Sequence, residues 1–539
     1  MTTALRVTVI GLLLTVVITA GTRPAPAVSP ATGDAAAVVH VLNRVTFGAR
    51  PEDIARVRAV GLTRWLEQQL DPDRLADDGV ERQLAALPTL SRSIGDLQRE
   101  YARPDRDMRE KMAGGEMTRR ELLQRYPLDR RPARITAELE AARLLRAVHS
   151  ERQLQEVMVD FWFNHFNVFA DKGQVRWYVT SYERDVIRPH ALGKFPDLLR
   201  ATARHPAMLF YLDNWVSTRP DFTLRSGLNK GKKGGLNENY ARELMELHTL
   251  GVEGGYTQKD VTEVARAFTG WTIDRPRQDA RFVFRPLVHD AAEKTVLGTR
   301  LPAGGGEQDG ERVLDLLARH PATARFVAGK LVRRFVGDVP PPALVDRVAA
   351  VYRDTGGDVR AMLRAIFTSP ELVAPEARRA KIKKPFEFVA SAVRAVGAVT
   401  DTRGAFALAR ATAEIGEPLF HAQPPTRYPD RGDAWVNAGA LLARMNFALA
   451  LTQHRLPGVT TAVAGLVTAE ERARPDAVLE RLLDRLLHGE TTSNTRAVLT
   501  AHLDDAQIIR KTSDDRGPAD TDVEKLAALV LGSPEFQRR

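Results

Sequence analysis

The chain has 539 residues, of which 44% are hydrophobic and 27% charged, so it is neither a wholly disordered nor a fibrous protein. It contains no cysteine, which excludes disulfides, thiolate nucleophiles and cysteine-ligated zinc or iron–sulfur centres. The formal net charge of +10 is spread along the chain rather than gathered in one tail.

The first 27 residues have the pattern of a secretory signal peptide. Arg6 precedes an apolar run over residues 7–20, and Ala25-Pro26-Ala27 offers small residues where a signal peptidase cleaves. The apolar run is shorter than the roughly 20 residues of a spanning helix, so we expect an exported protein without a stable membrane span after cleavage. An uncleaved N-terminal anchor is the alternative. Residues 28–34 form a predicted linker.

Apolar residues at three- and four-residue spacing predict a mainly α protein, a globular array of many helices. We divide it into a main helical domain (residues 35–457) and a C-terminal helical segment (458–539). Helices are expected over residues 35–43, 51–60, 63–70, 135–169 with a break near 149–151, 174–187, 195–203, 237–250, 257–268, and again from 311.

Two segments depart from the apolar helical pattern. Residues 99–134 are dense in charge, which is typical of a solvated face. Residues 281–284 (RFVF) and 294–297 (KTVL) are rich in β-branched and aromatic side chains, and they predict a small β-hairpin inserted near residues 281–298.

Two later helices share a pattern. Asp358-Val359 leads to Ser369-Pro370 with the same spacing as Asp522-Val523 leads to Ser533-Pro534. Both pairs predict an amphipathic helix stopped by a proline.

The helix predicted around residues 157–170 carries polar residues among five aromatic ones. At 100° per residue, Asp160, Asn164 and Asn167 share one face and His165 lies on a neighbouring face. Because buried polar groups need partners, these residues bind either a ligand or one another. A structural network that ties helices together is the alternative to a functional site.

The helix predicted over residues 237–250 carries a second polar set. Asn239, Glu243 and Glu246 fall on one face of a straight helix, where two carboxylates fit a metal ion or a general-acid pair. Ion pairing to arginines such as Arg242 and Arg266 is the alternative.

The connection between the two predicted strands holds His289-Asp290, which joins the site only if the hairpin folds over the polar helices. In the enzyme hypothesis Glu243 and His165 are the catalytic residues, and Glu243 is the candidate base. A divalent metal ion would be held by the oxygen and imidazole donors of these residues: Asp160, Asn164, Asn239, Glu246, His289 and Asp290.

Taken together, these segments resemble a bacterial family of exported proteins, the domain-of-unknown-function 1800 family. The resemblance implies a secreted, mainly helical protein, and it brings no catalytic residue. Members are often encoded beside exported proteins that resemble alkaline phosphatases and sulfatases, which implies such a partner. The matching segments are residues 42–48 (LNRVTFG), 161–166 (FWFNHF), 235–244 (GLNENYAREL), 246–252 (ELHTLGV), 255–257 (GYT), 267–272 (AFTGWT), 289–290 (HD), 368–371 (TSPE), 384–387 (KPFE), 423–425 (QPP) and Trp435.

Two functional hypotheses follow. The first is an exported, metal-dependent, hydrolase-like enzyme that acts on a cell-envelope or extracellular substrate. The second is a non-catalytic helical binding or assembly protein, whose basic surface engages an anionic envelope polymer or a secreted partner protein. Nucleic acid is not expected, because the charge is diffuse and no binding motif is present. Polar side chains converging on an open cavity would favour the first hypothesis, and mutual pairing in a dry interior the second.

Overall fold

The computed structural model describes residues 35–223, 231, 233–503, 509–510 and 520–539. The described chain is mainly helical, and its few strands pair in short two-stranded antiparallel sheets, which confirms the predicted fold class. The predicted signal peptide (1–27) and linker (28–34) lie outside the described residues. No helix in the described ranges has both the length and the apolar character needed to cross a membrane.

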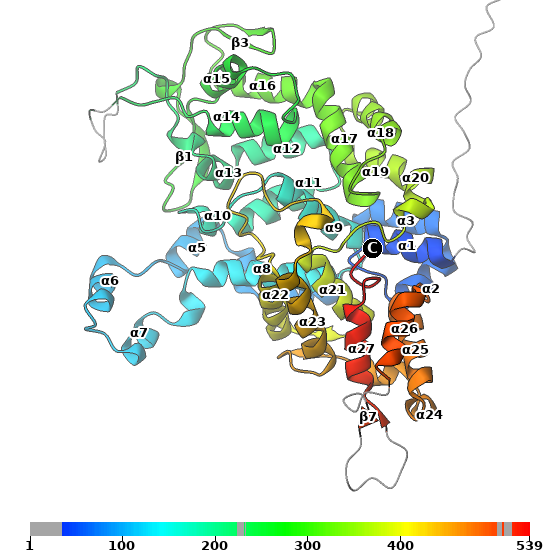
Figure 1. Cartoon of the computed structure of the whole chain (residues 1–539). Coiled ribbons are helices and arrows are strands. Elements are labelled where there is room, and N and C mark those ends of the chain that lie inside the picture. Colours follow the sequence, from blue (N-terminus) through cyan, green and yellow to red (C-terminus); the bar gives the residue numbers. More distant parts are fainter. Residues whose placement is uncertain (1–34, 224–230, 232, 504–508, 511–519) are drawn as a thin grey trace, which may run out of the picture.

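The N-terminal region wraps around the middle of the molecule (Figure 1). Its last helix, α8, is long and mostly buried, and it packs against α22 of the C-terminal region. The helices are α1 (Ala35–Val45), α2 (Pro51–Val60), α3 (Leu62–Leu70), α4 (Asp78–Leu84), α5 (Ile94–Glu100), α6 (Arg106–Ala113), α7 (Arg119–Arg125) and α8 (Ala133–His149).

The central region forms one end of the molecule, around α12, α14 and α17 (Figure 1). Its elements are α9 (Gln153–His165), α10 (Val175–Ser181), the π-helix η4 (Tyr182–Ile187), α11 (Arg188–His190), α12 (Phe195–Arg204), α13 (Pro206–Tyr211), α14 (Asn239–Glu243), the π-helix η6 (Leu244–Thr249), α15 (Gln258–Ala267), β1 (Trp271–Asp274), β2 (Arg281–Phe284), β3 (Lys294–Val296), β4 (Thr299–Leu301), α16 (Gln308–Arg319), α17 (Pro321–Phe335), α18 (Pro342–Thr355), α19 (Val359–Phe367) and α20 (Pro370–Val373).

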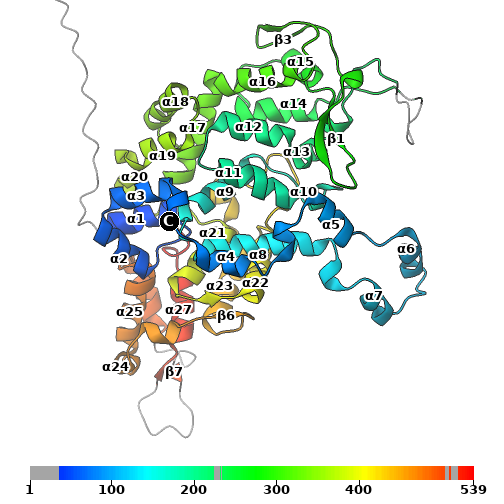
Figure 2. The same ribbon diagram turned by 180° about the vertical axis from the view of Figure 1, so that it is seen from behind.

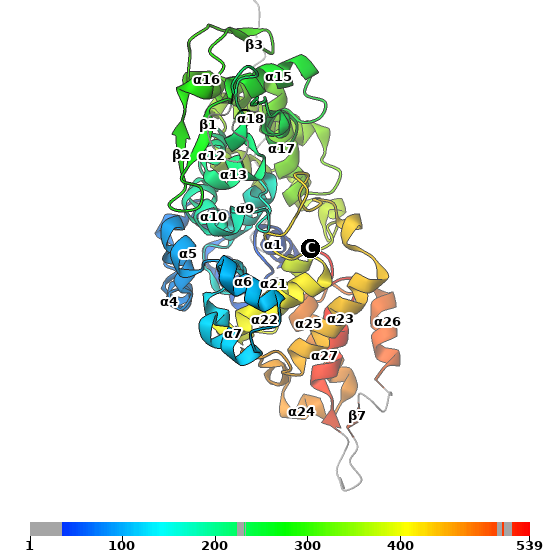
Figure 3. The ribbon, with the colours of Figure 1, turned by 90° about the vertical axis from the view of Figure 1, so that its left-hand side faces the viewer.

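The C-terminal region forms the opposite end, which the side view separates clearly from α15–α18 (Figure 3). Its elements are α21 (Pro385–Ala395), β5 (Val399–Thr400), α22 (Thr402–Ile415), α23 (Ala438–Thr452), β6 (Val459–Thr460), α24 (Ala469–Arg472), α25 (Pro475–Leu487), α26 (Ser493–Ala501), β7 (Ile509–Arg510), β8 (Asp520–Thr521) and α27 (Val523–Gly532). Short 3₁₀ turns connect the helices: η1 (Pro72–Arg74), η2 (Pro88–Ser91), η3 (Leu128–Arg130), η5 (Asn214–Val216), η7 (Pro286–Val288), η8 (Pro375–Ala377), η9 (Gly432–Trp435) and η10 (Val463–Leu466).

One hydrophobic cluster runs through all three regions, from Val38 in α1 to Phe536 after α27. Helix α9 lies near its centre, and Trp162 is fully buried there with its indole N–H donating to Ala191 O at 2.9 Å. The predicted helix break is confirmed, because α8 ends at His149 and α9 begins at Gln153. Helix α9 itself ends at His165, so Asn167 follows the helix instead of extending its face.

Side-chain caps define several helix starts. Thr257 accepts a hydrogen bond from Asp260 N and forms a capping box with that residue. Asp358 and Asp522 both accept a backbone N–H three residues on, so the two similar helices α19 and α27 begin alike.

The strands pair differently from the predicted hairpin. Both predicted segments are extended, but β2 pairs with β1 and β3 pairs with β4. The physical reason is the tight turn at Leu297-Gly298, where both residues have positive φ, 48° and 75°. A two-residue turn of this kind joins neighbouring strands directly, so residue 297 belongs to the turn and the partner strand follows it.

The charge-dense segment projects from the body as a lobe that carries α6 and α7 (Figures 1 and 2). We call residues 102–131 the basic arm. Each of its residues is exposed or partly exposed, which agrees with the predicted solvated face. Its base is fixed by a hydrogen bond from Tyr126 Oη to Ala102 O, 3.0 Å long, and by Arg103, which lies over the Trp177 ring.

Candidate functional site

Asp160 on helix α9 is 5% exposed and neutralised by two cations. Its Oδ1 lies 3.0 Å from Arg143 Nη1 on α8, and its Oδ2 lies 3.1 Å from Lys384 Nζ. Lys384 also pairs with buried Glu417, at 3.2 Å. Although burial opposes it, Asp160 and Glu417 raise the pKa of Lys384. Both carboxylate oxygens of Asp160 are therefore engaged by protein cations.

Two asparagines hold a single loop, residues 417–437, against α9. Asn164 Nδ2 donates to Tyr428 O (3.0 Å) and its Oδ1 accepts from Tyr428 N (3.2 Å). Asn167 Nδ2 donates to Ala422 O at 3.0 Å. We call this pair the asparagine clamp. The clamped loop contains Arg427 at φ 63°, a strained conformation for a residue with a side chain.

His165 lies in an aromatic environment and is 1% exposed. Its Nε2 donates to His248 O at 3.0 Å, and its Nδ1 has no hydrogen-bond partner among the described residues. Burial, followed by nearby Lys330, lowers the pKa of His165 well below its usual value, so the ring is neutral at pH 7. The ring packs against Trp162 and Phe166, and it lies too deep to meet a bulky substrate.

Asn239 and Glu243 are partly exposed on α14, and Glu246 follows on η6. The straight-helix geometry used to place the three on one face does not extend beyond Glu243, because the π-helix that begins at Leu244 changes the number of residues per turn. Glu246 accepts from Tyr256 Oη at 3.2 Å. Glu243 makes no hydrogen bond or ion pair within the described structure, and burial followed by Glu246 raises its pKa.

His289 and Asp290 secure the β-hairpins to α15 and α16. Asp290 forms a two-point ion pair with Arg266, with distances of 2.7 and 3.2 Å. His289 Nδ1 donates to Thr269 O at 2.8 Å, and its Nε2 lies 3.2 Å from buried Asp309. Both side chains are therefore occupied by structural contacts at the hairpin.

The six predicted metal ligands do not form one cluster. Asp160 and Asn164 belong to the interior around α9, Asn239 and Glu246 to the surface of α14 and η6, and the last two to the hairpins: His289 and Asp290. Among the residues with described coordinates, no three His, Asp or Glu side chains gather to hold a metal ion. The arrangement around α9 and the hairpins is one of mutual pairing.

Sequence reasoning missed a buried ion pair beside α9. Lys330 on α17 is 5% exposed, and its Nζ lies 3.2 Å from Asp430 Oδ2 in the clamped loop. Burial, then Arg427, lowers the pKa of Lys330 to about 7. Lys330 also lines an open groove of about 590 Å³ between α17, α18 and the turn after η6. A sequence signal existed, since Lys330 and Arg334 follow buried Val327 at helical spacing.

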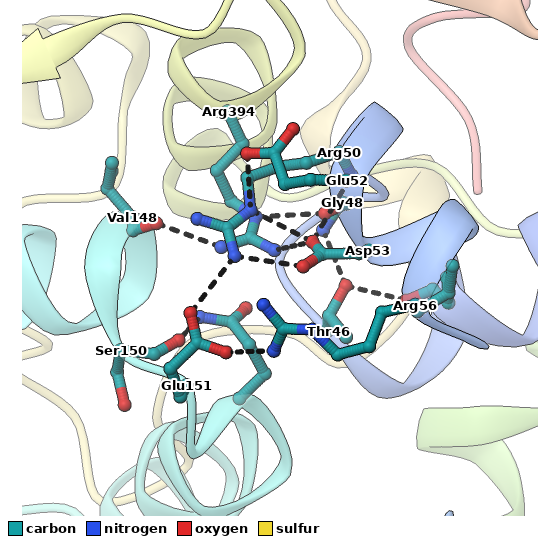
Figure 4. Close-up of polar contacts among 12 residues, drawn as sticks. Thr46, Gly48, Arg50, Glu52, Asp53, Arg56, Val148, Ser150, Glu151 and Arg394 are labelled. Atoms are coloured by element: carbon teal, nitrogen blue, oxygen red, sulfur yellow. Dashed lines mark hydrogen bonds and ion pairs between the residues drawn. The ribbon is translucent and has the colours of Figure 1, made fainter. Parts of the chain in front are cut away.

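A second missed cluster ties the N-terminal helices to α21, and we call it the Arg394 knot (Figure 4). Arg394 donates to Gly48 O at 2.8 Å and to Val148 O at 2.8 Å, and its Nη2 lies 2.7 Å from Asp53 Oδ2. Arg50 binds the same carboxylate and reaches towards Glu151. Each nitrogen of this fully buried guanidinium thus has an acceptor.

These features define a large, mainly helical protein whose buried ionic side chains bridge its N-terminal, central and C-terminal regions. A family model described as "Protein of unknown function (DUF1800)" matches residues 40–538. The chain therefore belongs to this family, which confirms the resemblance seen in its sequence. No curated protein and no solved structure matches the chain.

Proposed function

We propose that this is an exported, non-catalytic assembly protein that holds an acidic partner protein through its basic arm. The single observation that carries the proposal is that the arm consists of short helices without buried residues. Its helices α6 and α7 have eight and seven residues and bury none of them. Helices this short are marginal in water unless they pack against something. A partner surface would supply the missing contacts.

The charge of the basic arm indicates what kind of partner fits. Between Arg103 and Arg131 it carries nine arginine and lysine residues against six acidic ones. Within the described structure Arg119, Arg120 and Arg125 on α7 make no ion pair. Charges without a partner on a projecting lobe attract an opposite surface and speed its association.

Exposed apolar side chains on the arm favour a folded protein as the occupant. Met112 is 42% exposed, Leu123 37% and Leu128 65%. Covering such side chains with a protein surface stabilises the complex, whereas a polyanion would engage only the cations. The partner that we propose is an exported protein with an acidic face, of the alkaline phosphatase and sulfatase type that family resemblance implies.

A binding experiment with matched charge reversals tests the proposal. The triple variant Arg119→Glu, Arg120→Glu, Arg125→Glu reverses the sign of the net charge of the arm. The control triple Arg319→Glu, Arg353→Glu, Arg403→Glu makes the same charge change at exposed residues of the body. We expect the arm variant to bind the immobilised partner at least about tenfold more weakly, and the control to bind within about twofold of wild type.

The outcome separates three cases. Equal weakening by both triples would mean nonspecific attraction and would contradict the proposal. Retention of polyanion binding together with loss of partner binding by the arm variant would support it. If the arm variant lost binding to an anionic envelope polymer while the partner protein bound neither form, the polymer would replace the protein as occupant.

One observation favours a second candidate function, a hydrolase-like activity at Glu243. This carboxyl group is half-buried and has a raised pKa, which suits a general acid, and it makes no hydrogen bond or ion pair among the described residues that would keep it from a substrate. A screen of ester, phosphate and glycoside substrates with wild type and Glu243→Gln tests it. Activity that Glu243→Gln abolishes would establish this candidate, and activity that is equal in both proteins would exclude Glu243.

A further inference from the structure

A small cavity of about 20 Å³ lies where helix α9, helix α17, the segment before α21 and the end of the clamped loop meet. Five of the side chains that line it are cations from different parts of the chain: Arg334 on α17, Lys381 and Lys384 before α21, Arg431 in the clamped loop, and Arg539 after α27. Arg431 pairs with Asp433 and Lys381 pairs with Asp338, which leaves Arg334 and Arg539 as the arginines of interest. A buried site with several cations needs negative charge close by.

The carboxylates that line the cavity supply only part of that charge. Asp160 is engaged by Arg143 and Lys384, as described above, and Asp430 is paired with Lys330. Glu387 alone lies between two guanidinium groups, with its Oε1 3.1 Å from Arg334 Nη2 and 3.0 Å from Arg539 Nη2. One carboxylate thus serves two arginines.

Arg334 shows most clearly that the protein does not supply enough hydrogen-bond acceptors at this site. It is 8% exposed, and none of its three side-chain nitrogens donates a hydrogen bond within the described structure. Arg539, 4% exposed, likewise leaves its Nε without an acceptor. In the Arg394 knot, by contrast, each guanidinium nitrogen has an acceptor. Buried donors without partners are rare in proteins unless water or an ion meets them.

A third arginine adds to the excess charge behind the cavity. Arg44 on α1 is fully buried, and its Nε and Nη1 have no hydrogen-bond partner among the described residues. Burial, then Arg539 and Arg334, lowers the pKa of Arg44 well below its usual value. Arg539 and Arg334 therefore lie close enough to Arg44 to disfavour its charge. A negative guest would relieve this repulsion.

We propose that the cavity binds one small inorganic anion of the size of chloride, which accepts N–H groups from Arg334 and Arg539. The volume favours a small guest, because about 20 Å³ is close to the space that one water molecule needs. The anion joins α17 to the segments before α21 and after α27, so its role is to stabilise the junction of the central and C-terminal regions.

Crystals of the protein soaked in bromide give a direct test. Bromide is the probe because it replaces chloride and scatters anomalously. We expect an anomalous peak in the cavity, within hydrogen-bond distance of Arg334 and Arg539. A cavity that holds only a water molecule after the soak would overturn the proposal.

Thermal unfolding in solution shows whether the anion matters outside a crystal. A ligand that binds only the folded state raises Tm with the logarithm of its concentration, so we expect a rise of about 2 °C between about 10 mM and about 300 mM chloride, with gluconate keeping ionic strength constant. Bromide should act like chloride. Phosphate should not exceed gluconate, and an equal effect of phosphate would contradict the proposed size.

Two matched variants locate the effect. Arg334→Met should abolish the dependence of Tm on chloride, whereas Arg353→Met, at an exposed arginine on α18, should retain it. If Arg334→Met does not fold, the comparison of chloride, phosphate and gluconate on wild type still decides the question. A Tm of wild type that is the same in chloride and gluconate would overturn the proposal.

Discussion

Both the Arg394 knot and the cavity lined by Arg334 bury an arginine, but only in the knot does each nitrogen of that arginine have an acceptor. Arg394 meets two carbonyl oxygens and the Asp53 carboxylate, so each nitrogen has an acceptor (Figure 4). Arg334 shares Glu387 with Arg539 and donates no hydrogen bond in the described structure. Burial of a charge is tolerated only when its hydrogen-bonding groups are satisfied, so the first cluster is complete and the second needs a guest.

The largest expected effect concerns the complete cluster. Asp53→Ala removes the carboxylate that both Arg394 and Arg50 bind, and it leaves a fully buried charge unpaired. We expect a loss of about 3–5 kcal/mol in the free energy of unfolding, measured by urea denaturation at pH 7. Glu52→Ala is the control, because Glu52 is 60% exposed and lies 3.4 Å from the same Arg50. The free energy of unfolding of this control should fall by no more than about 0.5 kcal/mol. Similar losses in both variants would mean that the buried Asp53 carboxylate is no more important than an exposed one.

The next effect concerns the wall of the cavity. Asn164→Ala removes half of the asparagine clamp and leaves both backbone groups of Tyr428 without their partner. The loss should be about 1–3 kcal/mol, with faster hydrogen exchange in residues 417–437. Asn494→Ala, at an exposed position of α26, should change neither the free energy of unfolding nor the hydrogen exchange of this loop. Unchanged exchange in the loop after Asn164→Ala would show that other contacts hold it.

The effect that is smallest per unit measured concerns the titration of the cavity wall. Burial, then Arg539, lowers the pKa of Lys381 in the cavity wall to about 8. Between pH 8 and the unfolded pKa near 10.5, the unfolded chain binds more protons at this site than the folded chain, so stability rises with pH in this window. The contribution is about 1 kcal/mol per pH unit.

Urea denaturation at several pH values measures this slope. Lys381→Met should flatten it relative to wild type, whereas Lys259→Met, at an exposed lysine, should leave it unchanged. Chloride should flatten the wild-type slope too, because a bound anion favours the protonated form of Lys381. A slope that is identical in wild type and Lys381→Met would mean that the pKa of this lysine is not lowered in the folded protein.

Local patterns predicted much of the fold. The break between α8 and α9 and the similar helices α19 and α27 follow from short-range signals, which act within a few residues. The π-helix at Leu244–Thr249 and the turn at Leu297 were not predicted. Both depend on backbone geometry that apolar periodicity does not encode, and each altered which residues face one another.

The candidate site was predictable only in part. The polar residues of α9 were expected to be buried with partners, and the structure places Asp160 and Asn164 in this way. Their partners are remote, since Asn164 binds Tyr428 at a separation of 264 residues and Asp160 meets Lys384 at 224. Pairings of this range depend on how the helices pack, so no local pattern could distinguish an ion network from a metal site.

The basic arm has a consequence for the lifetime of the protein. Its nine arginine and lysine residues stand in a segment without buried residues, so a trypsin-like protease would find its first cleavage sites there. A bound partner would shield these peptide bonds, and a free molecule would be clipped at the arm while its core stayed intact. Docking would therefore set how long each copy keeps an intact arm, and unpaired copies would lose theirs first.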